Sequence, residues 1–119
     1  MKAIKYFVAI MLVCSYTSGL SVRAQEKQTV DQKTSLVKVW GNCDMCKTRI
    51  EKAAKEEGAT TASWDKKTKM LTVTFNPAKT SVDSIEKKIA LVGHDTERYR
   101  ADDKTYNSLP ACCKYERRK

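Results

Sequence analysis

Two cysteines three residues apart, Cys43 and Cys46, are the residues whose types and spacing most clearly allow chemistry in this sequence. They lie in the stretch GNCDMCKTRIEKAA, residues 41–54. Thiols at this spacing can form a disulfide, act as a redox pair or bind a metal ion. Two sulfur ligands suit soft ions such as Cu(I), and by the same logic Hg(II). A structural Zn(II) site usually takes four ligands, so zinc would need help from elsewhere in the chain.

The segments on either side of this pair predict where the two thiols lie. Residues 35–40 alternate as a strand does, and residues 45–57 have helical periodicity. Cys43 is therefore expected in the loop that leaves the strand, and Cys46 in the first turn of the helix. Free N–H groups and the positive end of the helix dipole favour thiolates there, so we expect lowered pKa values for both cysteines.

Apolar periodicity along residues 35–100 predicts six elements. Their order is strand, helix, strand, strand, helix and a weakly signalled strand, over residues 35–40, 45–57, 59–65, 70–75, 81–92 and 94–100. Asp44 is the expected N-cap of the first helix, and Gly58 and Gly93 are the expected helix ends. This order predicts an α+β class, the ferredoxin-like βαββαβ sandwich, in which a four-stranded antiparallel sheet carries two helices on one face.

A resemblance to a known family rests on the cysteine motif and on the residues that follow it. Gly41 precedes the Cys-x-x-Cys, and the helix continues to Ile50-Glu51. Further matches are Asn76-Pro77, Ile85 with Ile89, and Gly93-His94. Residues 35–100 resemble the heavy-metal-associated domain, which is found in copper chaperones, in metal-pumping ATPases and in periplasmic mercury-binding proteins. The resemblance implies that Cys43 and Cys46 are metal ligands.

Two features depart from the family pattern. The family usually has Gly-Met-Thr or Gly-Met-His before the first cysteine, whereas only Asn42 separates Gly41 from Cys43 here. The second feature is His94. In the family, the loop before the last strand lies near the loop that carries the Cys-x-x-Cys, which we call the metal loop. His94 could add a nitrogen ligand or a proton-sensitive hydrogen bond, or it could be a surface histidine at a strand start.

The C-terminal tail, residues 101–119, lies outside the family resemblance and holds the adjacent pair Cys112 and Cys113. Three interpretations of this pair are open. The cysteines could form a vicinal disulfide or remain as solvent-facing thiols. The tail could instead fold back so that one or both sulfurs join Cys43 and Cys46 as ligands. A covalent bridge from the tail to the metal loop is the third.

The first 24 residues have the layout of a secretory signal peptide. A basic start is followed by an apolar run from Tyr6 to Val13, and Val22-Arg23-Ala24 places small residues before a cut at Gln25. The apolar run is shorter than a membrane span of about 20 residues. An uncleaved anchor and a lipoprotein cut before Cys14 are the less favoured alternatives. We expect an exported protein, with the periplasm as its destination.

Cleavage would leave a flexible lead-in at residues 25–34, the metal domain at 35–100 and the tail. The whole chain has 119 residues with 23 basic and 14 acidic side chains. Removing residues 1–24 takes away three basic residues and no acidic one, which lowers the net charge from +9 to +6. Charges of both signs alternate and no basic cluster is interleaved with aromatic residues, so we expect no nucleic-acid partner.

The sequence therefore favours an exported carrier that captures a soft ion, Cu(I) first, and transfers it to a metal-transporting or metal-accepting protein. Basic residues Lys47, Arg49 and Lys52 could orient an acidic docking face. A Hg(II) carrier is the close alternative. We expect a non-enzyme, as a monomer or a weak metal-bridged dimer. A thiol–disulfide oxidoreductase and a purely structural module are the rivals from other classes.

Overall fold

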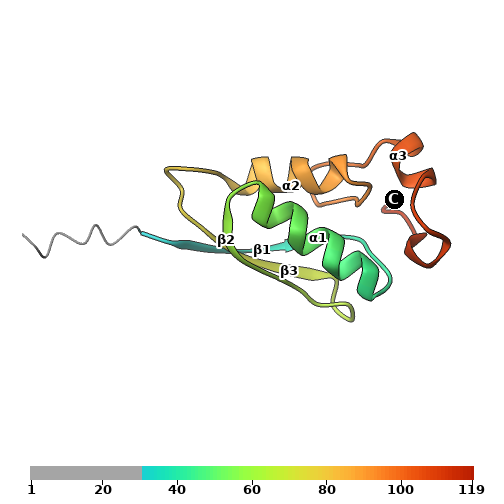
Figure 1. Cartoon of the computed structure of the whole chain (residues 1–119), viewed down its shortest axis with the longest axis horizontal. Coiled ribbons are helices and arrows are strands. Elements are labelled where there is room, and N and C mark those ends of the chain that lie inside the picture. Colours follow the sequence, from blue (N-terminus) through green and yellow to red (C-terminus); the bar gives the residue numbers. More distant parts are fainter. Residues whose placement is uncertain (1–30) are drawn as a thin grey trace, which may run out of the picture.

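The computed structural model describes residues 31–119. The predicted signal peptide, and the lead-in up to residue 30, lie outside the described residues. Within residues 31–119, no helix is both long enough and apolar enough to cross a membrane. Figure 1 shows the sheet with its two main helices at the centre and the C-terminal tail gathered at one end.

The sheet has three antiparallel strands: β1 (Lys33–Lys38), β2 (Ala59–Trp64) and β3 (Met70–Phe75). Their order in space is β1-β3-β2, so β3 is central and pairs with both neighbours. The predicted hairpin of β2 and β3 is therefore confirmed. β1 begins and ends two residues before the predicted strand, because Val39 pairs outside this sheet through an isolated bridge.

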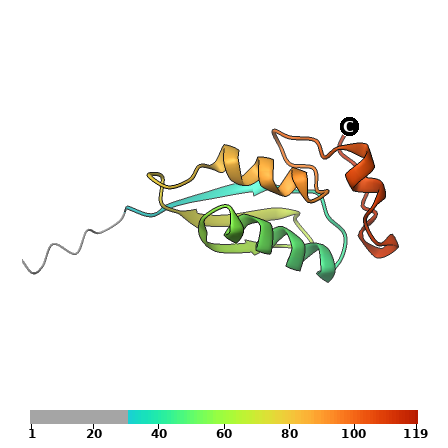
Figure 2. The same ribbon diagram turned by 45° about the horizontal axis from the view of Figure 1, so that its top comes forward.

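Two helices cover one face of the sheet, as Figure 2 shows: α1 (Asp44–Glu56) and α2 (Val82–Leu91). Side chains alternate along each strand, and those on the helix side are buried. Leu36 on the opposite face is 65% exposed. The fully buried centre of the core is formed by residues from both layers: Ile50, Leu71, Val73, Ile85 and Ile89. The α+β class and the two-layer arrangement are thus as predicted.

The helix ends follow local chemistry. Ser81 is the N-cap of α2, and its hydroxyl accepts a hydrogen bond from the Ser84 N–H at 3.1 Å. Gly58 ends α1 with a left-handed φ of 109°. The prediction that Asp44 caps α1 is wrong. Cys43 is the N-cap instead, with extended backbone and no side-chain cap hydrogen bond.

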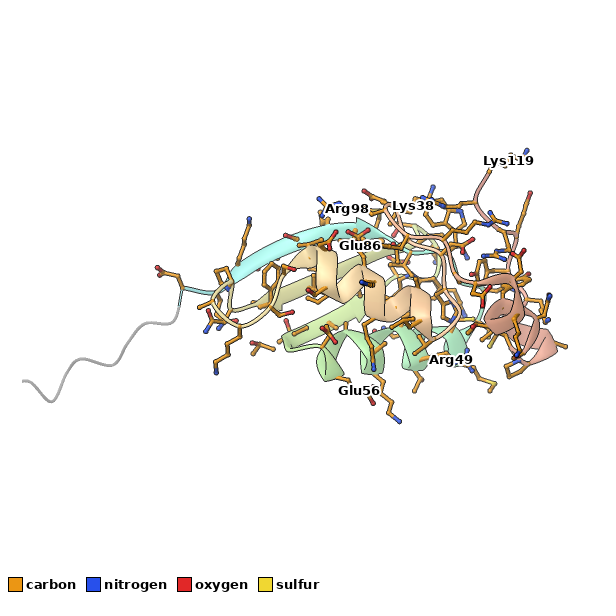
Figure 3. The ribbon with its side chains drawn as sticks, turned by 90° about the horizontal axis from the view of Figure 1, so that it is seen from above. Lys38, Arg49, Glu56, Glu86, Arg98 and Lys119 are labelled. Atoms are coloured by element: carbon orange, nitrogen blue, oxygen red, sulfur yellow. The ribbon has the colours of Figure 1, made fainter. Side chains whose placement is uncertain are left out.

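The predicted fourth strand, residues 94–100, is not observed. This segment makes one isolated bridge, between Val39 and Thr96. After that bridge the chain turns, because the Thr96 N–H donates to the Tyr99 carbonyl at 2.7 Å. The Arg98 N–H donates to the buried carboxylate of Glu86 at 3.2 Å, and these two residues lie beside each other in Figure 3. A carboxylate from α2 therefore satisfies a backbone N–H of this segment in place of a neighbouring strand.

The tail is folded. It contains a short helix, α3 (Asp103–Asn107), and a 3-10 turn, η2 (Ala111–Cys113). In both Figure 1 and Figure 2 it lies at the end of the molecule where α1 begins. The structure thus brings the second cysteine pair to the predicted metal loop.

Candidate metal centre

The loop before the first cysteine is pressed against the core. A Cβ added to Gly41 would lie 2.9 Å from the indole ring of Trp64 and 3.2 Å from Cβ of Cys46. The Trp64 Nε1–H donates to the Val39 carbonyl at 3.0 Å, which fixes the indole. Only glycine allows the backbone at position 41 to lie this close to the Trp64 ring, which explains the glycine before Asn42.

The two cysteines of the motif lie together, with their Sγ atoms 3.5 Å apart. Cys43 is partly buried at the N-cap of α1, and Cys46 is fully buried on the stripe that faces the sheet. Burial raises the pKa of Cys43, but the nearby backbone N–H groups of the first helical turn and the neighbouring thiols of Cys113 and Cys46 lower it to about 7. The expectation of a thiolate-favouring position is therefore confirmed for Cys43.

The same expectation is wrong for Cys46. Burial raises the pKa of Cys46 to about 11, and hydrogen bonds from backbone N–H groups only partly offset this. The reason is its place on the apolar stripe of α1, because a thiolate there would lose its hydration. The pair is thus asymmetric, with one thiol that ionises near neutral pH and one that stays protonated in the metal-free protein.

The tail brings two more sulfurs to this pair. Cys113 Sγ lies 3.5 Å from Cys43 Sγ and is fully buried. Cys112 is exposed, and its sulfur lies 3.9 Å from Cys113 Sγ and 3.4 Å from the Met45 thioether. The sulfurs of Cys43, Cys112 and Cys113 all lie within 4.8 Å of one another. In residues 31–119 all four cysteines are free thiols.

Arg49 is the cation that reaches these sulfurs. Its Nη1–H donates to Cys113 Sγ at 3.3 Å and lies 3.4 Å from His94 Nε2. Lys47, one residue after Cys46, binds the Glu51 carboxylate and the Trp64 carbonyl instead. Figure 3 labels Arg49 on α1, the same helix that begins at the motif.

His94 lies buried behind Arg49. Its Nδ1 is 2.9 Å from the Trp40 carbonyl, which can only accept, so Nδ1 carries the proton and Nε2 is left free to accept from Arg49. Burial, together with the charge of Arg49, lowers the pKa of His94 to about 4. The Arg49 guanidinium therefore contacts both the neutral imidazole of His94 and the sulfur of Cys113.

Sequence reasoning missed Tyr115, which holds the tail in place. Its ring stacks on the His94 imidazole with centroids 5.3 Å apart. Its hydroxyl donates to the Gly93 carbonyl at 2.7 Å and accepts from the Asp95 N–H at 2.8 Å. The sequence signal was an aromatic residue two positions after the cysteine pair, followed by charged residues.

Comparison with known proteins finds the same fold in metal-binding domains. No protein-family model and no curated protein sequence matches this chain. Among solved structures, oxidised MerP from Ralstonia metallidurans CH34 is 30% identical, with a TM-score of 0.53 over 56% of this chain and 96% of that one. The Cu(I)-loaded N-terminal domain of a potential copper-translocating P-type ATPase from Bacillus subtilis is 25% identical, with a TM-score of 0.52. The match covers 56% of this chain and 85% of that one.

A metallochaperone, CopZ, is 24% identical with a TM-score of 0.51, over 54% of this chain and 98% of that chain, and supports the fold alone. The two-layer fold and the sulfur cluster at the start of α1 define a small heavy-metal-binding domain. The chain belongs to the heavy-metal-associated domain family.

Proposed function

We propose that this protein captures a soft metal ion, Cu(I) first, after export and passes it to a metal-transporting or metal-accepting protein, without catalysing a reaction. The observation that carries the proposal is the 3.5 Å separation of Cys43 and Cys46 sulfurs at the start of α1. Two adjacent thiols there can converge on one soft ion. The Cu(I)-loaded state of a similar ATPase domain supports copper as the first candidate.

Capture begins at Cys43, because this thiol is partly accessible and its pKa is about 7. A metal ion then displaces the proton of Cys46, since a bound cation offsets the cost of a buried thiolate. Transfer proceeds by ligand exchange, in which an incoming partner sulfur replaces one sulfur of this chain at a time. Asp44 and Asn42, on either side of Cys43, are exposed, so a partner sulfur can approach that side of the ion.

The surface around the site favours a partner with acidic groups. The side chain of Lys52 is 73% exposed on α1. Lys66 is about half exposed and pairs with Asp44 beside the motif. Such surface cations mainly set orientation and association rate. An exported location, with the periplasm as the destination, follows from the layout of residues 1–24 and would be tested by fractionating cells that express the full chain.

The direct test is titration of the reduced protein with Cu(I), Hg(II) and Zn(II), each against a competing chelator. Wild type should bind one soft ion tightly and Zn(II) weakly. Cys43→Ser should abolish tight binding, because Cys43 contacts both Cys46 and the tail. Asp44→Asn, which changes the exposed neighbour, is the matched control and should bind like wild type. A wild-type protein that binds none of the three ions tightly would refute the proposal, and a strong preference for Hg(II) would replace copper by mercury.

Thiol–disulfide exchange is the second candidate, because one specific observation favours it. Cys43 has a lowered pKa and Cys46 a raised one, which is the asymmetry of an attacking and a resolving thiol. An insulin-reduction assay of the metal-free protein separates the two functions. Turnover that requires Cys43 and is insensitive to prior metal loading would favour the redox function.

A further inference from the structure

The C-terminal tail places its sulfurs at the motif through contacts that involve no thiol. Tyr115 bridges the Gly93 carbonyl and the Asp95 N–H, and it makes an edge contact with Tyr106 at 5.0 Å between centroids. Arg117 binds both carboxylate oxygens of the fully buried Asp95, at 2.8 and 3.1 Å. Because these anchors flank the cysteine pair, the positions of its sulfurs are set by the fold.

The turn that carries the two thiols is itself defined. The Cys113 N–H donates to the Pro110 carbonyl at 2.8 Å, which closes η2. The Asn42 side chain donates to the Cys112 carbonyl at 3.4 Å, so the metal loop and the tail also touch through a polar contact. Leu109 packs against Gly93 and is buried, which holds the start of the turn against the domain.

The sulfur separations fit an ion with three sulfur ligands. With metal–sulfur bonds of about 2.3 Å, two sulfurs on opposite sides of an ion lie about 4.6 Å apart, and sulfurs of a trigonal site about 4.0 Å apart. Cys43 Sγ is 3.5 Å from Cys113 Sγ, and Cys113 Sγ is 3.9 Å from Cys112 Sγ. The third side of this triangle is within 4.8 Å. Cys113 is as near to Cys43 as Cys46 is.

The charge around the cluster suits several thiolates. Three thiolates around Cu(I) carry a net charge of −2, which is costly in a partly buried site unless cations or hydrogen-bond donors face it. Arg49 donates directly to Cys113 Sγ at 3.3 Å. The N-terminal turn of α1 presents its N–H groups to Cys43, whose sulfur is close to those of both Cys46 and Cys113.

We propose that Cys43, Cys112 and Cys113 form a three-sulfur binding site for a soft metal ion, which shares Cys43 with the Cys43–Cys46 pair. This inference rests on the proposed function and deepens it. The ion can be held by Cys43 together with Cys46, or by Cys43 together with the tail. Cys112 is the exposed ligand of the set, so it is the sulfur at which a partner's thiol first replaces one of this chain's thiols.

The test compares two cysteine variants in a Cu(I) competition titration with a Cu(I) chelator. Cys46→Ser retains all three sulfurs of the proposed site and should still bind one Cu(I). Cys112→Ser/Cys113→Ser retains only the motif pair and should bind at least about tenfold more weakly than wild type, which corresponds to roughly 1.4 kcal/mol. Ser108→Ala, in the same tail but away from the sulfurs, is the matched control. Far-UV circular dichroism confirms that each variant is folded.

A second measurement uses wild type alone, so it does not depend on a variant's stability. Cysteine alkylation, resolved by residue with mass spectrometry, is compared with and without one equivalent of Cu(I). Cys112 is exposed in the metal-free structure and should be alkylated quickly, whereas Cu(I) should protect it. X-ray absorption of the same sample should show three sulfur neighbours around copper.

The outcomes separate the two proposals. If Cys46→Ser loses Cu(I) and the tail variant binds like wild type, with Cys112 unprotected, the three-sulfur site is refuted and the two-cysteine carrier stands. If wild type binds no soft ion, both proposals fail. Retention of Cu(I) by Cys46→Ser together with protection of Cys112 supports the three-sulfur site.

Discussion

The ring of Tyr115 stacks on the imidazole of His94, with centroids 5.3 Å apart and an angle of 21° between the planes. This contact joins the end of the tail to the segment that follows α2. Both rings are buried, and Tyr115 is two residues from Cys113 while His94 contacts Arg49. The stacking therefore couples the position of the tail sulfurs to the packing of the domain.

Tyr115→Phe keeps the ring and removes the hydroxyl. The buried Gly93 carbonyl and Asp95 N–H would then lose their partner, which should lower the free energy of unfolding by about 1–3 kcal/mol. Urea denaturation measures this loss. Tyr99→Phe is the matched control, because the Tyr99 hydroxyl contacts only the exposed carboxylate of Asp83 and its removal should cost little. Equal stability of Tyr115→Phe and wild type would contradict the assigned anchor.

His94 should make stability depend on pH above the range in which carboxylates usually titrate. Its pKa falls from 6.5 to about 4 on folding, because burial and the charge of Arg49 disfavour the imidazolium while Asp95 and the Trp40 carbonyl favour it. The unfolded chain then binds the proton more readily. Stability is therefore complete above pH 6.5 and should fall by roughly 2 kcal/mol between pH 6.5 and about 5.

Denaturation at a series of pH values checks this loss, with His94→Gln as the variant that should lack it. His94 is the single histidine of the chain, so its ring resonances in NMR report its protonation directly. Protonation of the folded protein near pH 6.5 would show that the imidazole is not desolvated.

Gly41→Ala should destabilise the contact between the metal loop and the core. The added methyl group would lie 2.9 Å from the Trp64 ring and 3.2 Å from the Cys46 Cβ, so the ring or the loop must move. Overpacking of this kind costs about 1–3 kcal/mol. Thermal unfolding measures the cost, and a change in tryptophan fluorescence shows the ring moving. Lys55→Ala, at an exposed position of α1, should leave both readings close to wild type.

Arg117→Met should release the tail. Burial alone would raise the pKa of Asp95, but hydrogen bonds from Arg117 and from the Ala101 N–H hold it below its usual value, so the buried carboxylate stays charged. Without the guanidinium this charge loses its partner, and stability should fall by about 3 kcal/mol. Cys113 should also be alkylated faster. Restoration of stability by adding Asp95→Asn would confirm the mechanism, while Lys104→Met, at an exposed lysine of the same tail, should have little effect.

The fold could be predicted where periodicity decides it. The helical spacing of Cys46, Ile50 and Ala53 predicted α1, and the alternation along Met70–Phe75 predicted β3. Both predictions succeeded because burial of one face leaves a periodic pattern within the segment's own sequence. The fourth strand could not be predicted correctly, since residues from other segments decide it. Glu86 on α2 binds the Arg98 N–H, and such contacts leave no mark in the periodicity of residues 94–100.

For the candidate site too, the features set by local sequence could be predicted and those set by distant segments could not. Cys43 and Cys46 were found from their spacing, and the lowered pKa of Cys43 follows from its place at a helix start. The raised pKa of Cys46 was missed, because its burial depends on the whole core. The position of Cys113 was left open among three interpretations, and its contact with Cys43 depends on Tyr115 and Arg117, whose partners lie about 20 residues away.

Cys43 occupies the N-cap of α1 without making the hydrogen bond that a serine or an aspartate would make there. The first N–H groups of the helix are thus turned toward a sulfur whose charge depends on whether an ion is bound. On the proposed function, a bound soft ion would keep that sulfur anionic and so stabilise the first turn through its N–H groups. Release of the ion would remove this stabilisation, so metal release and loosening of the first turn of α1 would be thermodynamically linked.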